Sequence, residues 1–212
     1  MQLWVGLGNP GANYALHRHN VGFMAVEALA AAQTPAHLGS PRWTEKWKGL
    51  TTTVTCGGQR CVLLQPQTYM NRSGASVVPA MQFHRIPAGQ TIVIHDEIDF
   101  SLGRLAIKKG GGHGGHNGLR DIVAQLGSAE FLRVRLGVGR PVHGEVADYV
   151  LSDFRPDEQG PAADLVERRT RAEVQTLLAE LASRPVAPPA LRVVPITVQP
   201  RGRRRFDRAC AV

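Results

Sequence analysis

The sequence contains few cysteines and aromatic residues, and it has no long apolar run. Its three cysteines, Cys56, Cys61 and Cys210, form no C-x-x-C pair and leave one thiol unpaired in any disulfide scheme. This usage fits a reducing compartment better than a disulfide framework. No stretch approaches the ~20 apolar residues of a membrane span, and no signal peptide is visible. We therefore expect a cytoplasmic protein that does not enter membranes.

Acidic residues are in the minority, at 17 Asp and Glu against 25 Lys and Arg, which gives a net charge of +8. The excess has two locations. Residues 184–212 hold seven arginines and one aspartate, and residues 102–140 hold seven basic and two acidic residues. Such basicity suggests a polyanionic partner. The length of 212 residues and the 43% hydrophobic content exclude a disordered or fibrous chain and fit one domain.

The chain divides into a domain over residues 1–183 and a tail over residues 184–212. Proline, alanine and arginine dominate the tail, which predicts a flexible extension and not a second domain. Within the domain, periodicity predicts strands at 3–7, 51–55, 61–64, 91–95, 103–109 and 131–138. It predicts helices at 20–32, from 73, at 117–126 and from 165.

Strands that alternate with helices indicate an α/β fold, a single layered domain with a central β-sheet flanked by helices. The predicted hairpin around Gly57-Gly58 adds antiparallel pairing and makes the sheet mixed. Pro79 should kink or shorten its helix, and Asn117 should cap the helix that follows it. The nearly all-apolar run at 91–95 is typical of a central strand covered on both faces.

Two glycine-rich segments are candidates for nucleotide-binding loops. The first, Gly6-Leu-Gly-Asn-Pro-Gly11, satisfies G-x-G-x-x-G, but a polar loop follows it where a dinucleotide-binding fold has a helix. A dehydrogenase is therefore disfavoured. The second, residues 110–118, lacks the Gly-Lys-Ser/Thr ending of a P-loop. It can bring backbone N–H groups and a helix N-terminus against an anion or a peptide.

One acid and one histidine are candidates for proton transfer. Asp96 is the first acid after the central strand, where sites form in open α/β sheets, and His19 lies on a loop near the end of the first strand. A carboxylate that fixes one imidazole nitrogen leaves the other free as a general base. Glu97 and Asp99 are interpreted as solvating their loop.

Eight histidines also raise the possibility of a metal site, with His113, His116 and either His95 or Asp96 as ligands. A His-x-x-His pair on a glycine loop lacks the helix that usually fixes such ligands, and no cysteine is near it in the sequence. We therefore expect no metal and no cofactor.

Taken together, several dispersed segments resemble the bacterial peptidyl-tRNA hydrolase family over residues 1–155. The segments are Gly6-Leu-Gly-Asn-Pro-Gly11, Tyr14, Arg18-His-Asn-Val-Gly22, Gln65-Pro-Gln-Thr-Tyr-Met-Asn71, Ser73-Gly74, His95-Asp-Glu97 and 110–118. The resemblance implies a monomeric α/β enzyme that hydrolyses the ester between an N-blocked peptide and the 3′-terminal ribose of tRNA. Such an enzyme recycles tRNA from prematurely released peptidyl-tRNA in translation and ribosome rescue.

The resemblance also implies roles for individual residues. His19 is similar to the catalytic base of the family, and Asp96 is similar to the carboxylate that orients it. Residues similar to those that contact substrate and tRNA form a longer set: Asn9, Asn71 and Asn117 as site asparagines, Tyr14, Met70 and His116 in the cleft, and Lys108 and Arg135 as the clamp for the 5′ phosphate of the tRNA.

The chain departs from the family in two places. His17 stands where the family often has threonine, two residues before the base, and the tail after about Arg184 has no counterpart. The main alternative function is a non-catalytic RNA-binding homologue of the same fold. The presence of both His19 and Asp96 argues against it.

Overall fold

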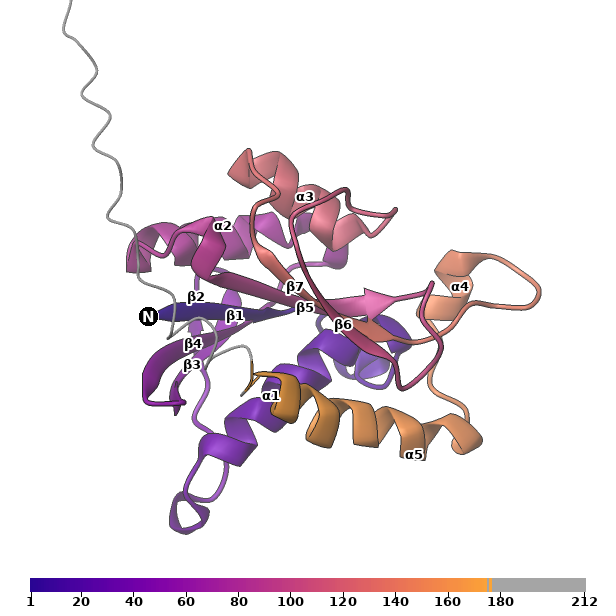
Figure 1. The fold of residues 1–212 in the computed structure, drawn as a ribbon, viewed down its shortest axis with the longest axis horizontal. Helices are drawn as coiled ribbons and strands as arrows, with labels where there is room; N and C mark the ends of the chain where they lie inside the picture. Colours follow the sequence, from indigo (N-terminus) through magenta and orange to yellow (C-terminus); the bar gives the residue numbers. More distant parts are fainter. Residues whose placement is uncertain (175, 177–212) are drawn as a thin grey trace, which may run out of the picture.

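The computed structural model describes residues 1–174 and 176, which form a single sheet with helices on both faces (Figure 1). The strands are β1 (Gln2–Gly6), β2 (Thr44–Lys46), β3 (Gly49–Cys56), β4 (Gln59–Pro66), β5 (Thr91–Glu97), β6 (Leu105–Lys109) and β7 (Leu132–Gly137). The α-helices are α1 (Val21–Gln33), α2 (Gly74–His84), α3 (Asn117–Leu126), α4 (Val146–Val150) and α5 (Pro156–Asp164). Short 3-10 helices include η1 (Ala12–Tyr14), η2 (Arg18–Asn20) and η4 (Met70–Arg72), and the π-helical segment η6 (Leu165–Arg169) continues α5.

The seven strands lie in the order β2-β3-β4-β1-β5-β7-β6. Four of them, β4, β1, β5 and β7, are parallel to one another, whereas β2, β3 and β6 pair antiparallel. The predicted α/β fold with a mixed sheet is confirmed. Because β1 and β5 are adjacent and parallel, the loops that follow them open at the same edge of the sheet.

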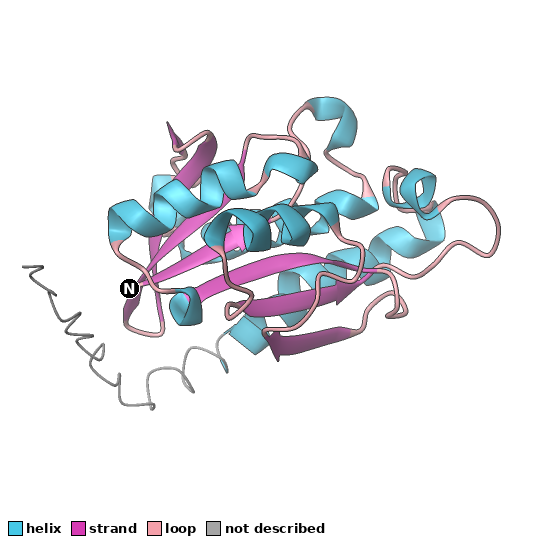
Figure 2. Cartoon of the chain, turned by 90° about the horizontal axis from the view of Figure 1, so that it is seen from above, coloured by secondary structure: helices cyan, strands magenta, loops and turns pink. Residues whose placement is uncertain are grey.

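Both faces of the central strands are covered. One apolar cluster packs α1 and the α5–η6 segment on one face, and a second packs α2 and α3 on the other. The two views show this three-layer arrangement, with α2 and α3 above the sheet in Figure 1 and the helices laid along the strands in Figure 2. Strand β5 is buried from Thr91 to Asp96, as its apolar sequence predicts.

The close approach of α1 to β1 depends on two glycines. A Cβ atom at Gly6 would lie 2.2 Å from the backbone oxygen of Gly22, and a Cβ at Gly22 would lie 2.4 Å from that of Ile94. The first glycine of the G-x-G-x-x-G segment therefore serves helix–strand packing. Helix α1 begins at Val21, after η1 and η2, so no α-helix follows the G-x-G-x-x-G segment directly.

The helix predictions need three corrections. Helix α2 continues through Pro79 to His84, although the proline lacks an N–H for the carbonyl one turn earlier. The N-cap of α3 is His116, and Asn117 is its first helical residue. The last helix begins at Pro156, well before Leu165.

Two elements carry no apolar pattern that would predict them. Strand β2 consists of three exposed residues, and α4 has only five residues. The predicted domain boundary between residues 183 and 184, and the tail itself, lie outside the described residues. Among the described helices, none is long and apolar enough to cross a membrane.

Candidate active site

His19 and Asp96 meet at the edge of the sheet where β1 and β5 end. Asp96 is the penultimate residue of β5, and His19 lies in η2, which follows β1 through a short loop and leads into α1. His19 Nδ1 lies 2.8 Å from Asp96 Oδ1. The carboxylate of Asp96 is nearly inaccessible to solvent. The structure thus brings the predicted base and its predicted orienting acid into direct hydrogen-bond contact.

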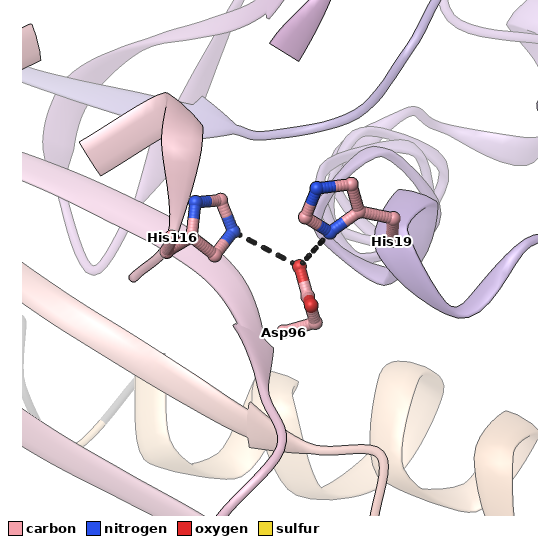
Figure 3. A group of neighbouring side chains, drawn as sticks. All are labelled: His19, Asp96 and His116. Atoms are coloured by element: carbon pink, nitrogen blue, oxygen red, sulfur yellow. Dashed lines mark hydrogen bonds and ion pairs between the residues drawn. The ribbon is translucent and has the colours of Figure 1, made fainter. Parts of the chain in front are cut away.

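A second histidine donates to the same carboxylate oxygen. His116 Nε2 lies 3.0 Å from Asp96 Oδ1, so that two imidazoles flank one aspartate (Figure 3). The other nitrogen of His116, Nδ1, accepts backbone N–H bonds from Gly118 and Leu119 at the start of α3. These bonds require Nδ1 to be unprotonated, so the proton of neutral His116 is on Nε2, directed at Asp96.

The buried charges shift three pKa values. Burial raises the pKa of Asp96, but the nearby His19 and His116 have a larger, opposite effect. The pKa of Asp96 is therefore well below its usual range. Burial lowers the pKa of His19, but the charge and hydrogen bond of Asp96 outweigh it and raise the pKa above the ordinary 6.5. Burial and His116 lower the pKa of His95 to about 3, so His95 stays neutral.

Asn9 lies in the loop after β1 and contacts Asn20, the residue that follows His19. Its Oδ1 accepts the backbone N–H of Met70 at 2.8 Å, and its own backbone is held by Asn20, which accepts from Asn9 N and donates to Asn9 O. With its oxygen occupied, the amide NH2 of Asn9 hydrogen-bonds to no other described residue. The sequence predicts Asn20 only as a helix cap. Its side chain makes no cap bond and instead fixes Asn9.

The other two site asparagines are more exposed. Asn117 Oδ1 accepts a bond from Arg120 Nη1 at 3.1 Å, which again leaves an amide NH2 available. The side chain of Asn71, in η4, makes no hydrogen bond to another residue in the part of the chain that the structure describes. Met70 packs against α3, since a Cβ at Gly118 would lie 2.7 Å from the Met70 sulfur. Tyr14 contacts His17 and Tyr69 edge to face at ring distances of 5.3 and 6.4 Å.

The predicted phosphate clamp opens into the same cavity as the base. A cavity of about 350 Å³ is lined by His19, Asp96, His116 and Asn117, and also by Lys108 and Arg135. Lys108 is on β6 and Arg135 on β7, and their side chains share one face of the sheet. Arg135 pairs with Glu97 at 2.8 Å, so Glu97 does more than solvate its loop. Asp99 pairs with Arg140 on the surface.

Two buried arginines that the sequence patterns do not single out hold the segments of the site. Arg133 donates to the carbonyls of Gly111 and Gly112 at 2.6 Å each, which anchors the glycine loop. Arg18, directly before the base, pairs with Glu158 and donates to Ser152 and Asp153. The position of Arg18 next to the candidate base is the signal available in the sequence, but its partners are over 130 residues away.

The metal hypothesis takes a different form in the structure. His19, Asp96 and His116 offer three ligand atoms within 4.8 Å of one another, whereas His113 and His95 are not part of the group. For His116 to bind a metal through Nε2, its proton would have to move to Nδ1. That change would break both bonds to the start of α3. The group therefore suits a proton-transfer site better than a metal site.

Comparisons with known proteins point to one family. The chain matches the family model for peptidyl-tRNA hydrolase over residues 3–186. The peptidyl-tRNA hydrolase of Geobacter sulfurreducens is 50% identical over 166 residues, which cover 78% of this chain and 83% of that protein. The one from Sorangium cellulosum is 49% identical over 178 residues, covering 82% and 78%.

A solved structure shows the same fold. The crystal structure of peptidyl-tRNA hydrolase from Acinetobacter baumannii matches with a TM-score of 0.74 and 38% identity, covering 86% of this chain and 92% of that one. Family, relatives and fold thus agree over most of the sequence. The chain belongs to the peptidyl-tRNA hydrolase family, whose members hydrolyse peptidyl-tRNA.

Proposed function

We propose that this enzyme cleaves the ester between an N-blocked peptide and the 3′-terminal ribose of tRNA by direct attack of water, with His19 as the general base. The contact between His19 Nδ1 and Asp96 Oδ1 carries this proposal. Ionised Asp96 accepts a hydrogen bond from the Nδ1–H of neutral His19, so Nε2 of His19 keeps its lone pair for a water proton.

The reaction then needs stabilisation of negative charge. As His19 Nε2 takes a proton from water, the hydroxide forms a bond to the ester carbonyl carbon, and the carbonyl oxygen becomes an oxyanion. The uncommitted NH2 of Asn9 or Asn117 is a suitable donor to that oxygen. The C–O bond to the ribose then breaks, and the proton on His19 passes to the departing ribose oxygen.

The remaining predicted residues are assigned to binding. We assign Asn71, Tyr14, Met70 and His116 to the peptide side of the cleft, and Lys108 and Arg135 to the 5′ phosphate of the tRNA. The site residues all come from one chain, which supports a monomer as the active form. Cys56 and Cys61 are both buried free thiols, which supports a reducing, cytoplasmic setting.

Release of labelled peptide from peptidyl-tRNA tests the base assignment. His19→Asn removes the proton acceptor and should lower kcat by about 10²–10⁴-fold, the usual contribution of a general base. Aminoacyl-tRNA with a free amine is the control substrate. Full activity of His19→Asn would overturn the base assignment, and an inactive wild type would overturn hydrolysis itself.

A further inference from the structure

Three aromatic rings meet on a surface outside the active-site cavity. Trp47, in the turn between β2 and β3, lies with its ring centroid 5.1 Å from Phe83 and from His84, at the end of α2. Phe83 and His84 are 5.0 Å apart. Phe83 is 67% exposed, whereas Trp47 is half-buried against the core under α2. A rigid, core-anchored aromatic cluster therefore presents one ring to solvent.

Basic side chains surround these rings. Lys46 Nζ lies 6.0 Å from the centroid of the Trp47 ring. Arg60 alternates with Cys61 along β4, so it lies on the face of the sheet that carries Val62 and Leu64 and packs against α2. Lys46 and Arg60 are exposed. Glu45 is the acid of this hairpin, but it alternates with Lys46 along β2 and so faces the other side of the strand. We call Lys46, Trp47, Arg60, Phe83 and His84 the Trp47–Phe83 surface.

The backbone around this surface is strained. Among the described residues, three that are not glycine have positive φ: Trp47 at 51°, Lys48 at 54° and Arg85 at 54°. All three border the Trp47–Phe83 surface. Glycine or asparagine would relax a two-residue hairpin turn or a left-handed helix end. The chain instead has an aromatic residue and two exposed cations there. These three residues therefore hold a conformation that costs free energy for any side chain with a Cβ atom.

An exposed aromatic ring flanked by cations suits single-stranded nucleic acid, because any base can stack on the ring while adjacent phosphates meet the cations. We propose that the Trp47–Phe83 surface binds an unpaired segment of RNA, with a base stacked on Phe83 and phosphates against Lys46 and Arg60. This surface is separate from the proposed phosphate clamp, since β2 and β6 are at opposite edges of the sheet. The proposal does not depend on the catalytic roles assigned above.

Fluorescence anisotropy of labelled single-stranded oligouridylate with the full-length protein tests the proposal. Phe83→Leu keeps an apolar side chain but removes the ring, and should weaken binding by about fivefold or more. Phe83→Tyr keeps the ring and should bind like the wild type. Arg60→Gln should reduce the slope of log affinity against log salt by about 1. Arg171→Gln is the control, an exposed arginine on the last described helix, and should leave the slope nearly unchanged.

The same variants separate RNA binding from an effect on catalysis and from self-association. Hydrolysis of a minimal peptidyl-ribose ester by Phe83→Leu should equal that of the wild type, because Phe83 does not line the active-site cavity. Unchanged RNA affinity in Phe83→Leu would overturn the proposal, as would equal weakening in Phe83→Leu and Phe83→Tyr. A dimer in sedimentation velocity that Phe83→Leu abolishes without changing RNA affinity would instead identify a contact between two copies.

Discussion

At the scale of single residues, the chemistry of the site depends on which atom holds each proton. The backbone N–H of Gly118 donates to Nδ1 of His116, so the proton of neutral His116 is on Nε2. Asp96 accepts a hydrogen bond from Nδ1–H of His19. Both donors converge on one carboxylate oxygen. Asp96 therefore remains ionised, and the lone pair of neutral His19 is directed away from it.

The raised pKa of His19 predicts the pH dependence of the reaction. Protonated His19 cannot act as a base, so kcat/KM should rise with pH, with a midpoint above 6.5. Asp96→Asn removes the charge that raises this pKa and leaves the burial that lowers it, so the midpoint should fall below 6.5. The same variant should lose roughly 10²-fold or more in kcat. Equal midpoints in wild type and Asp96→Asn would contradict the coupling.

The proposed phosphate clamp predicts a change in binding and not in chemistry. Replacement of Lys108 and Arg135 by alanine removes two cations from the cavity and should raise KM for full-length peptidyl-tRNA. The variant should also show a smaller dependence of KM on salt. A minimal peptidyl-ribose ester lacks the 5′ phosphate and is the control substrate. Equal losses on both substrates would argue against a clamp.

At the scale of elements, one side chain links helix α3 to the active site. His116 is both the N-cap of α3 and a donor to Asp96. The sequence suggests Asn117 for the cap, because asparagine is a frequent N-cap and histidine is not. The signal that favours His116 is its contact with Asp96, twenty residues earlier on strand β5, which local propensity does not contain.

A matched pair of variants separates these two roles of His116. Both His116→Asn and His116→Ala remove the imidazole that reaches Asp96, but asparagine can still cap α3. We expect His116→Ala to have a free energy of unfolding about 1 kcal/mol lower than His116→Asn. Urea unfolding measures the difference, and both variants should show reduced activity. Equal stability of the two variants would mean that the cap bonds contribute nothing.

Elements with a strong pattern could be predicted and those without one could not. The apolar run at 91–95 predicts β5, and the spacing of apolar residues at 20–32 predicts α1. The observed bounds of both elements are within two residues of the predicted ones. Strand β2 is fully exposed and α4 is short, so neither has a hydrophobic period. Pro79 lies inside α2 because the flanking residues Val77, Ala80 and Met81 are buried in the core. Their packing outweighs the missing hydrogen bond.

At the scale of the whole molecule, the resemblance suggested the candidate site residues, and the structure shows which side chains support them. His19 and Asp96 could be paired in advance because strand ends converge at one edge of a parallel sheet. Arg18, Asn20 and Arg133 could not be assigned, because their roles depend on partners distant in sequence. Long-range pairing of this kind carries no periodic signal along the chain.

The buried pair of Arg18 and Glu158 predicts a large effect on stability. Both side chains are mostly buried, and Arg18 also packs on the rings of Tyr149 and Phe154. Glu158→Gln leaves the Arg18 charge buried without its partner and should lower the free energy of unfolding by about 3–5 kcal/mol. Glu167→Gln, an exposed glutamate without an ion pair among the described residues, is the control. A difference of less than about 0.5 kcal/mol between them would contradict this assignment.

The attachment of the His19 segment to residues 152–158 also has a consequence for synthesis. A growing chain on the ribosome is itself a peptidyl-tRNA, the kind of molecule that this enzyme destroys. His19 is made early, but Asp96, His116 and the contacts of Arg18 emerge only later, in that order. The contacts that hold the His19 segment in place are therefore complete only once Glu158 has been translated. The last of these contacts can form only when most of the protein has been made.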